Sequence, residues 1–138
     1  MASEINDWNR QIIEEFRLRG GKVGGMFEGA PIVLLHTTGA KSGKERVNPL
    51  VAFPDGERIF VFASYGGAPN DPDWFHNLVA NPQVTVEFGH DTYAATARIL
   101  DGAERDDIWN RQVALRPNFG EYQDKTARII PVVELVRG

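Results

Sequence analysis

The residue types best suited to chemistry gather in one glycine-rich turn, Thr37–Pro49. Lys41, Lys44 and Arg46 fall within six positions there, although the chain as a whole carries a net charge of −4. A turn that presents backbone N–H groups, hydroxyls and cations together can bind one anion. The turn therefore predicts a site for a phosphate-bearing ligand, although composition alone favours a solvated hairpin turn.

The spacing within this turn differs from that of a nucleotide-triphosphatase loop. Such a loop has four residues between its glycines, followed by Lys and Ser or Thr at the start of a helix. Here three residues separate Gly39 from Gly43, and Glu45 follows Lys44. Pro49 opposes a helix at this point. The sequence therefore excludes a P-loop.

Other reactive side chains lack the spacing that catalysis or metal binding requires. Three histidines fall in different elements, so we predict satisfied or surface side chains and no metal site: His36, His76 and His90. Ser64 is not in the Gly-x-Ser-x-Gly arrangement of hydrolases. A helix start explains the neighbouring carboxylates, with Asp71 as the cap and Asp73 in the first turn.

The composition is that of an ordinary soluble protein. Of the 138 residues, 42% are hydrophobic and 25% are charged. The negative net charge argues against a nucleic-acid partner. The absence of cysteine excludes disulfides and thiolate chemistry and fits a reducing cytosol. We expect a cytoplasmic monomer or homodimer, and a peripheral contact of the first helix with the inner face of the membrane stays open.

The period of the apolar residues predicts the elements that position these side chains. A 3.6-residue period indicates a first helix over residues 4–18, followed by a glycine-rich connector. Two further helices are predicted over residues 72–80 and 103–115. Apolar or alternating runs predict six strands, over residues 32–37, 46–53, 58–64, 83–88, 92–100 and 128–136.

These elements predict an α+β fold, a six-stranded and mostly antiparallel split β-barrel with flanking helices. The early connections are too short for the crossovers of a parallel sheet. We expect one globular domain overall. Residues 1–29 would form the N-terminal helix and its connector, and residues 30–138 the barrel.

Six ordered segments carry a resemblance to a known family. They lie at residues 37–43, 46–50, 63–69, 72–78, 80–82 and 130–133. From about Pro31 to its end, the chain resembles the deazaflavin (coenzyme F-420)-dependent nitroreductases and quinone reductases of actinobacteria. The resemblance implies a barrel related to flavin-binding split barrels. It also implies that residues 30–138 bind coenzyme F-420, an 8-hydroxy-5-deazaflavin with a phosphate and an oligoglutamate tail.

The resemblance further implies which residues bind the cofactor. The phosphate and tail would be held by the turn residues Ala40, Lys41, Ser42, Lys44 and Arg46. The ring would be lined by Val47, Asn48, Pro49, Leu50 and Val51, and by Phe62, Ala63, Ser64 and Tyr65. The residues that close over it would be Asp73, Trp74, Phe75, His76 and Asn77, with Phe119 as a further wall.

The implied reaction is hydride transfer from reduced coenzyme F-420 to a small planar electron-poor acceptor, such as a quinone or a nitroaromatic. Ser64 would donate a hydrogen bond to ring or substrate, and Tyr65 and Tyr122 would act as proton donors or pocket walls. Two alternatives stay open: an oxidoreductase that uses flavin mononucleotide, whose phosphate needs the same turn, and a non-catalytic deazaflavin carrier.

One segment departs from the family pattern. Well-known members carry a tyrosine-rich segment before the last strand that contacts the substrate. Here Arg116 and Phe119 stand where tyrosines would be, and only Tyr122 keeps its hydroxyl. We therefore expect cofactor affinity to be retained and nitroimidazole reduction to be weak.

Overall fold

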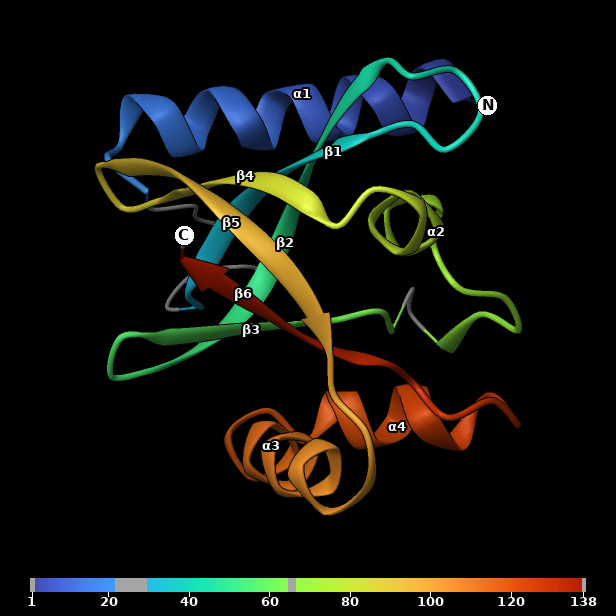
Figure 1. Cartoon of the computed structure of the whole chain (residues 1–138). Coiled ribbons are helices and arrows are strands. Elements are labelled where there is room, and N and C mark those ends of the chain that lie inside the picture. Colours follow the sequence, from blue (N-terminus) through green and yellow to red (C-terminus); the bar gives the residue numbers. More distant parts are fainter. Residues whose placement is uncertain (1, 22–29, 65–66, 138) are drawn as a thin grey trace.

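The fold is a closed barrel of six strands with helices packed around it (Figure 1). The computed structural model describes residues 2–21, 30–64 and 67–137, and only the backbone of residues 2–9. The strands are β1 (Ile32–Thr38), β2 (Glu45–Asp55), β3 (Arg58–Phe62), β4 (Gln83–Phe88), β5 (Asp91–Ile99) and β6 (Val132–Arg137). The helices are α1 (Ala2–Leu18), α2 (Asp73–Ala80), α3 (Gly102–Leu115) and α4 (Asn118–Asp124).

The strand order around the barrel is β1-β2-β3-β6-β5-β4, and β4 closes the ring by pairing with β1. All six of these pairings are antiparallel. The predicted α+β barrel with flanking helices is therefore confirmed. Successive strand residues point to opposite faces, so each strand gives one set of side chains to the interior and another to the helices outside.

Side chains from all six strands fill the interior of the barrel. Val33, Val61 and Val133 are fully buried there, and α2 adds Trp74 and Leu78 at one end. Alternation along β2 and β3 turns a second set outward, towards α3 and α4. In that outer cluster the Phe62 ring lies 6.0 Å from Trp109 and 5.5 Å from Phe119, both edge to face, a favourable aromatic geometry.

Helix α1 covers the outer face of β1 and β2. Its Ile12 and Phe16 are buried against Ile32 and Leu34, so these apolar side chains are used within the protein and do not support a membrane contact, although Leu18 at the end of the helix is exposed. At its far end Arg17 donates to Glu87, 2.7 Å from Nη2 to Oε2. Across the described ranges, no helix has the length and apolar character needed to cross a membrane.

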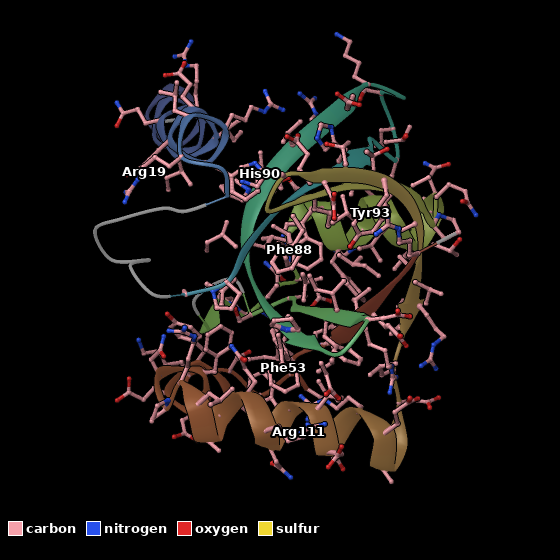
Figure 2. The ribbon with its side chains drawn as sticks, turned by 90° about the vertical axis from the view of Figure 1, so that its left-hand side faces the viewer. Arg19, Phe53, Phe88, His90, Tyr93 and Arg111 are labelled. Carbon is pink, nitrogen blue, oxygen red and sulfur yellow. The ribbon has the colours of Figure 1, made fainter. Side chains whose placement is uncertain are left out.

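Each of the three histidines has a place that fits the prediction of satisfied or surface side chains. His36 lies between two carboxylates, with Nε2 2.5 Å from Glu87 and Nδ1 3.4 Å from Glu45. His76 and His90 are exposed, and Figure 2 shows His90 beside the end of α1.

Two predicted boundaries are wrong for identifiable reasons. Asp71 does not cap α2: Pro72 occupies the cap position without a side-chain hydrogen bond, and the Asp71 carboxylate accepts from Arg128 instead, at 2.9 Å. The last strand begins at Val132 and not at residue 128. Pro131 has no N–H to donate to a ladder, and the Arg128 side chain is bound elsewhere.

Helix α4 was not predicted. Its seven residues are too few for an isolated helix to be stable, and Pro117 and Gly120 favour a turn. Packing supplies the missing stability, because Phe119 is buried against Trp109, with 6.3 Å between ring centroids. The tertiary contact therefore overrides the local preference.

A charge network ties β3, β5 and β6 to α3. Glu134, only 7% exposed, accepts from Arg58 at 3.0 Å and from Arg98 at 2.6 Å. Both arginines also reach Glu104 on α3. Hydrogen bonds from Arg58, and then from Arg98, hold the pKa of Glu134 below its ordinary value of 4.5. The ionised carboxylate is thus the centre of the network.

We predict that Glu134→Gln lowers the free energy of unfolding at pH 7 by about 1–2 kcal/mol, because two charge-assisted hydrogen bonds are weakened. A carboxyl group with a lowered pKa stabilises the fold above its unfolded pKa, and this stability is lost as pH falls through the folded pKa. The difference between the two proteins should therefore shrink below about pH 4. Urea unfolding at pH 7 and pH 3.5 measures it, with exposed Glu57→Gln as control. An equal difference at both pH values would contradict the prediction.

Candidate functional site

The turn between β1 and β2 has a fixed backbone. Gly39 N–H donates to the Lys44 carbonyl at 2.8 Å, and Gly43 N–H donates to the Gly39 carbonyl at 3.0 Å. The Ser42 hydroxyl accepts from Lys44 N–H at 3.2 Å. A Cβ at position 39 would lie 2.5 Å from Ser42 Oγ, so a larger residue there would displace the Ser42 side chain. The turn is therefore an ordered structure and not an open loop.

Asn77 of α2 fixes this turn against the barrel. Its Oδ1 accepts from Ala40 N–H at 3.0 Å, and its Nδ2 donates to the Thr37 hydroxyl at 3.4 Å. Both Asn77 and Thr37 are buried. Asn81, the residue after the end of α2, also contributes, because its amide donates to the Thr38 carbonyl at 3.5 Å. Asn77, expected to close over a cofactor, therefore uses its amide to hold the turn.

Three cations of the turn are left available to a ligand. Lys41, Lys44 and Arg46 are exposed, and none of them has an ion-pair partner within the described residues. The intervening Glu45 contacts His36 on the outer face, whereas Arg46 pairs in register with Thr37 on the opposite face. A concentrated positive charge on an ordered turn fits the phosphate and carboxylate groups of coenzyme F-420.

The pleat of β2 divides the residues expected to line the ring. Val47 and Val51 pack outward against the α1 cluster. Leu50 packs against the barrel interior, and Asn48 shares its face. Pro49 lies opposite Leu34 on the outer side. The structure therefore brings Val47, Pro49 and Val51 to one surface and turns Asn48 and Leu50 to another.

The segment around Ser64 lies against α4. A Cβ on Gly67 would lie 2.7 Å from the Tyr122 carbonyl, so the backbone at Gly67 approaches α4 closely. Tyr122 is half-buried, and its hydroxyl accepts from Asn118 at 3.1 Å. Ser64 is half-buried at the end of β3. The proposed catalytic residue Tyr65 lies outside the described residues.

The remaining candidates are mostly structural in this conformation. Phe62 and Phe119 belong to the outer cluster, while Ala63 and Trp74 belong to the barrel interior. Phe75 is half-buried beside that interior. Of the candidates on α2, Asp73 and His76 are exposed.

Arg128 organises the loop after Ser64, and sequence reasoning missed it. Its guanidinium donates to the carbonyls of Ala63 at 3.1 Å, Ser64 at 2.9 Å and Ala68 at 3.0 Å. It also binds the Asp71 carboxylate. These partners are 57 to 65 residues away in sequence, so no local pattern could reveal them. Arg128 thus determines where the Ser64 backbone lies.

We predict that Arg128→Lys loosens this loop while the barrel stays folded, because one ammonium cannot replace the fork of donors on a guanidinium. The amide hydrogen of Gly67, which donates to Ser64 at 2.9 Å, should exchange at least tenfold faster. Hydrogen exchange followed by NMR measures this. The matched control is Arg105→Lys, because Arg105 is similarly buried and also donates to a carbonyl, that of Ile130. Unchanged exchange at Gly67, or equal acceleration in the control, would contradict the prediction.

Comparisons with known proteins indicate one family. A model of the family described as F420H(2)-dependent quinone reductase matches residues 8–136. An F420H(2)-dependent quinone reductase of Mycobacterium tuberculosis (strain ATCC 25618 / H37Rv) is 38% identical over 126 residues, which cover 88% of this chain and 85% of that protein.

Two solved structures are also similar. The structure of an F420-H2 dependent reductase (FDR-A) is 45% identical with a TM-score of 0.70, covering 76% of this chain and 93% of that chain. Another, described as a domain-swapped dimer, is 41% identical with a TM-score of 0.72, covering 94% of this chain and 98% of that chain. The chain therefore belongs to the F420H(2)-dependent quinone reductase family.

Proposed function

We propose that this protein is an oxidoreductase that binds reduced coenzyme F-420 and reduces a quinone. The observation that carries the proposal is the ordered turn with three exposed cations, Lys41, Lys44 and Arg46, that have no ion-pair partner among the described residues of a chain of this family. Reduced coenzyme F-420 supplies a hydride when bound, and the quinone takes up this hydride and a proton to become a hydroquinone.

The protein's own residues would bind, orient and exclude water. The turn would hold the phosphate and oligoglutamate tail, with the hydroxyl of Ser42 and the side chains of Lys41, Lys44 and Arg46 as donors. The ring would lie along β2, lined by the half-buried residues Val47, Asn48, Pro49, Leu50 and Val51. Roughly 16 Å of strand, five residues at about 3.3 Å each, separate Arg46 from Val51. The two ends of one elongated cofactor could span that distance.

The acceptor would lie where the Ser64 loop meets α4. Ser64 would donate a hydrogen bond to the acceptor or the ring, and Tyr122 and Tyr65 would donate a proton or form a wall. Such fixed donors stabilise the negative charge that develops on a reduced quinone oxygen. In this proposal residues 30–138 carry the whole site, and residues 1–29 form a separate N-terminal segment.

We predict that the double variant Lys41→Ala, Arg46→Ala weakens binding of reduced coenzyme F-420 about 10- to 100-fold. Each charge-assisted contact contributes about 1.5–3 kcal/mol in gross terms, and exposure reduces this. Fluorescence titration of the deazaflavin measures the affinity. Arg111→Ala, which removes an exposed cation paired with Asp55, should leave the affinity unchanged.

The same titration tests the alternatives. Unchanged affinity in the double variant would mean that the turn does not bind the cofactor. Tighter binding of flavin mononucleotide than of coenzyme F-420 would favour a flavin enzyme. Binding of coenzyme F-420 without turnover across a panel of quinones would favour a carrier.

We predict that the purified protein reduces menadione efficiently and nitroimidazoles at least tenfold more slowly. Arg116 and Phe119 replace hydroxyl-bearing side chains, and the Phe119 ring is buried in an aromatic cluster. A pocket without these hydroxyls offers fewer hydrogen bonds to a nitro group. Oxidation of reduced coenzyme F-420, followed by absorbance, gives both rates. Comparable values of kcat/KM for the two acceptors would contradict this assignment.

A further inference from the structure

Arg128 lies in the segment that connects α4 to β6, and α4 fixes its backbone. The Arg128 carbonyl accepts from Nε2 of Gln123 at 2.6 Å, and its N–H donates to the Thr126 hydroxyl at 3.4 Å. The same Gln123 side chain accepts from Ile130 N–H at 3.0 Å. One side chain of α4 therefore determines where the Arg128 backbone lies.

The guanidinium of Arg128 extends this link to the end of β3. Its side chain is only 15% exposed. The Ser64 carbonyl accepts from Arg128 Nη2 and from Gly67 N–H, each at 2.9 Å. Because hydrogen bonds weaken steeply when they are misaligned, two donors on one carbonyl leave the Ser64 peptide group little freedom to rotate.

The charge of Arg128 is used within the protein. Four of the five guanidinium N–H donors have acceptors in the described part of the chain, three of them backbone carbonyls. The fourth acceptor is the Asp71 carboxylate, which also neutralises the charge. Arg128 therefore acts on the loop and not directly on a ligand.

The same contacts determine how far Ser64 lies from α4. Tyr122, the second residue expected at the acceptor, precedes Gln123 on that helix. Two separate contacts join the helix to the loop: the path from Gln123 through Arg128 to Ser64, and the close approach of Gly67 to the Tyr122 carbonyl. The relative position of Ser64 and Tyr122 thus depends on Arg128.

We propose that Arg128 is a positioning residue for the quinone acceptor, because it holds Ser64 and Tyr122 at the separation at which both can contact one quinone. The assignment rests on the proposed function, which takes these two residues as the donors to the acceptor. A displacement of about 1 Å in such a site lowers the rate on the order of 100-fold. The basic turn is anchored separately, by Asn77, so cofactor affinity does not depend on Arg128.

Arg128→Lys tests the position of the acceptor because it keeps the positive charge and removes the fork of donors. Single-turnover oxidation of reduced coenzyme F-420 by menadione should be about 10- to 100-fold slower, and the Kd of the coenzyme should stay within about twofold. The matched control Arg105→Lys loses a similarly buried fork, which donates to the Ile130 carbonyl. Its Tm reports the effect on stability alone, and its rate should stay within about twofold. An unchanged rate in Arg128→Lys, or an equal loss in the control, would overturn the proposal.

Gln123→Glu tests the same link from α4. A glutamate keeps the acceptor for Ile130 N–H and replaces the donor to the Arg128 carbonyl by a second oxygen, so the rate should fall. In the double variant with Arg128→Lys, the loss should be smaller than the product of the two single losses, because both substitutions change one separation. Losses that multiply would mean two independent effects and would contradict the link.

NMR distinguishes failure of this inference from failure of the proposed function. If the unaltered protein reduces menadione, a normal rate in Arg128→Lys refutes the positioning role and leaves the proposed function standing. If it does not reduce menadione, the proposed function is refuted, and the amide signals of ¹⁵N-labelled protein decide the inference. Menadione should then shift the signals of Ser64 and Tyr122, and Arg128→Lys should diminish the shift at Ser64. Shifts that are absent, or that the substitution leaves unchanged, would overturn the inference.

Discussion

The antiparallel pairing of β1 with β2 is the constraint on which the candidate site depends. Seven residue pairs, from Ile32 opposite Val51 to Thr38 opposite Glu45, place the basic turn at one end of the barrel. The same pairing decides which β2 residues face the interior and which face the helices. One-residue slippage would exchange these faces: Arg46 would leave the side of Thr37, and Val51 would leave the outer surface. The turn and the surface expected to hold the ring are thus positioned by one register.

The hairpins could be predicted from the sequence because their signals are local. Alternating apolar residues and short turns define β2–β3 and β4–β5, and the Gly89–His90 turn joins Phe88 directly to its partner Asp91. Closure of the barrel was expected only as a class of fold, since the pairing of β1 with β4 joins residues about 50 positions apart. Helix α4 and the start of β6 depend on packing and on Arg128. No pattern within a few residues carries that information.

The same distinction applies to the site. Lys41, Lys44 and Arg46 could be identified because they are close in sequence, and the structure leaves all three without an ion-pair partner among its described residues. The residues that line the ring were harder to predict from the sequence. Val47 to Val51 are consecutive on one strand, and consecutive strand residues point to opposite faces. Gln112 of α3, which lies outside the candidate site, also has a local signal: it follows Ile108 and Trp109 at helical spacing and interrupts their apolar face. A polar residue in such a stripe must be bonded, hydrated or functional.

Buried polar groups in this protein have two different roles. Asn77 binds the Ala40 N–H of the turn, and Arg128 binds the carbonyls of Ala63, Ser64 and Ala68, so these backbone groups are held in place before any ligand binds. Gln112 does the opposite, because its amide nitrogen is buried without an acceptor inside the described structure. Fixed loops lower the conformational entropy lost on binding. An unsatisfied buried donor costs folding free energy instead. The preformed turn between β1 and β2, with three exposed cations that have no ion-pair partner among the described residues, therefore favours an anion at that end of β2, as the phosphate-bearing reductant of the proposed function requires.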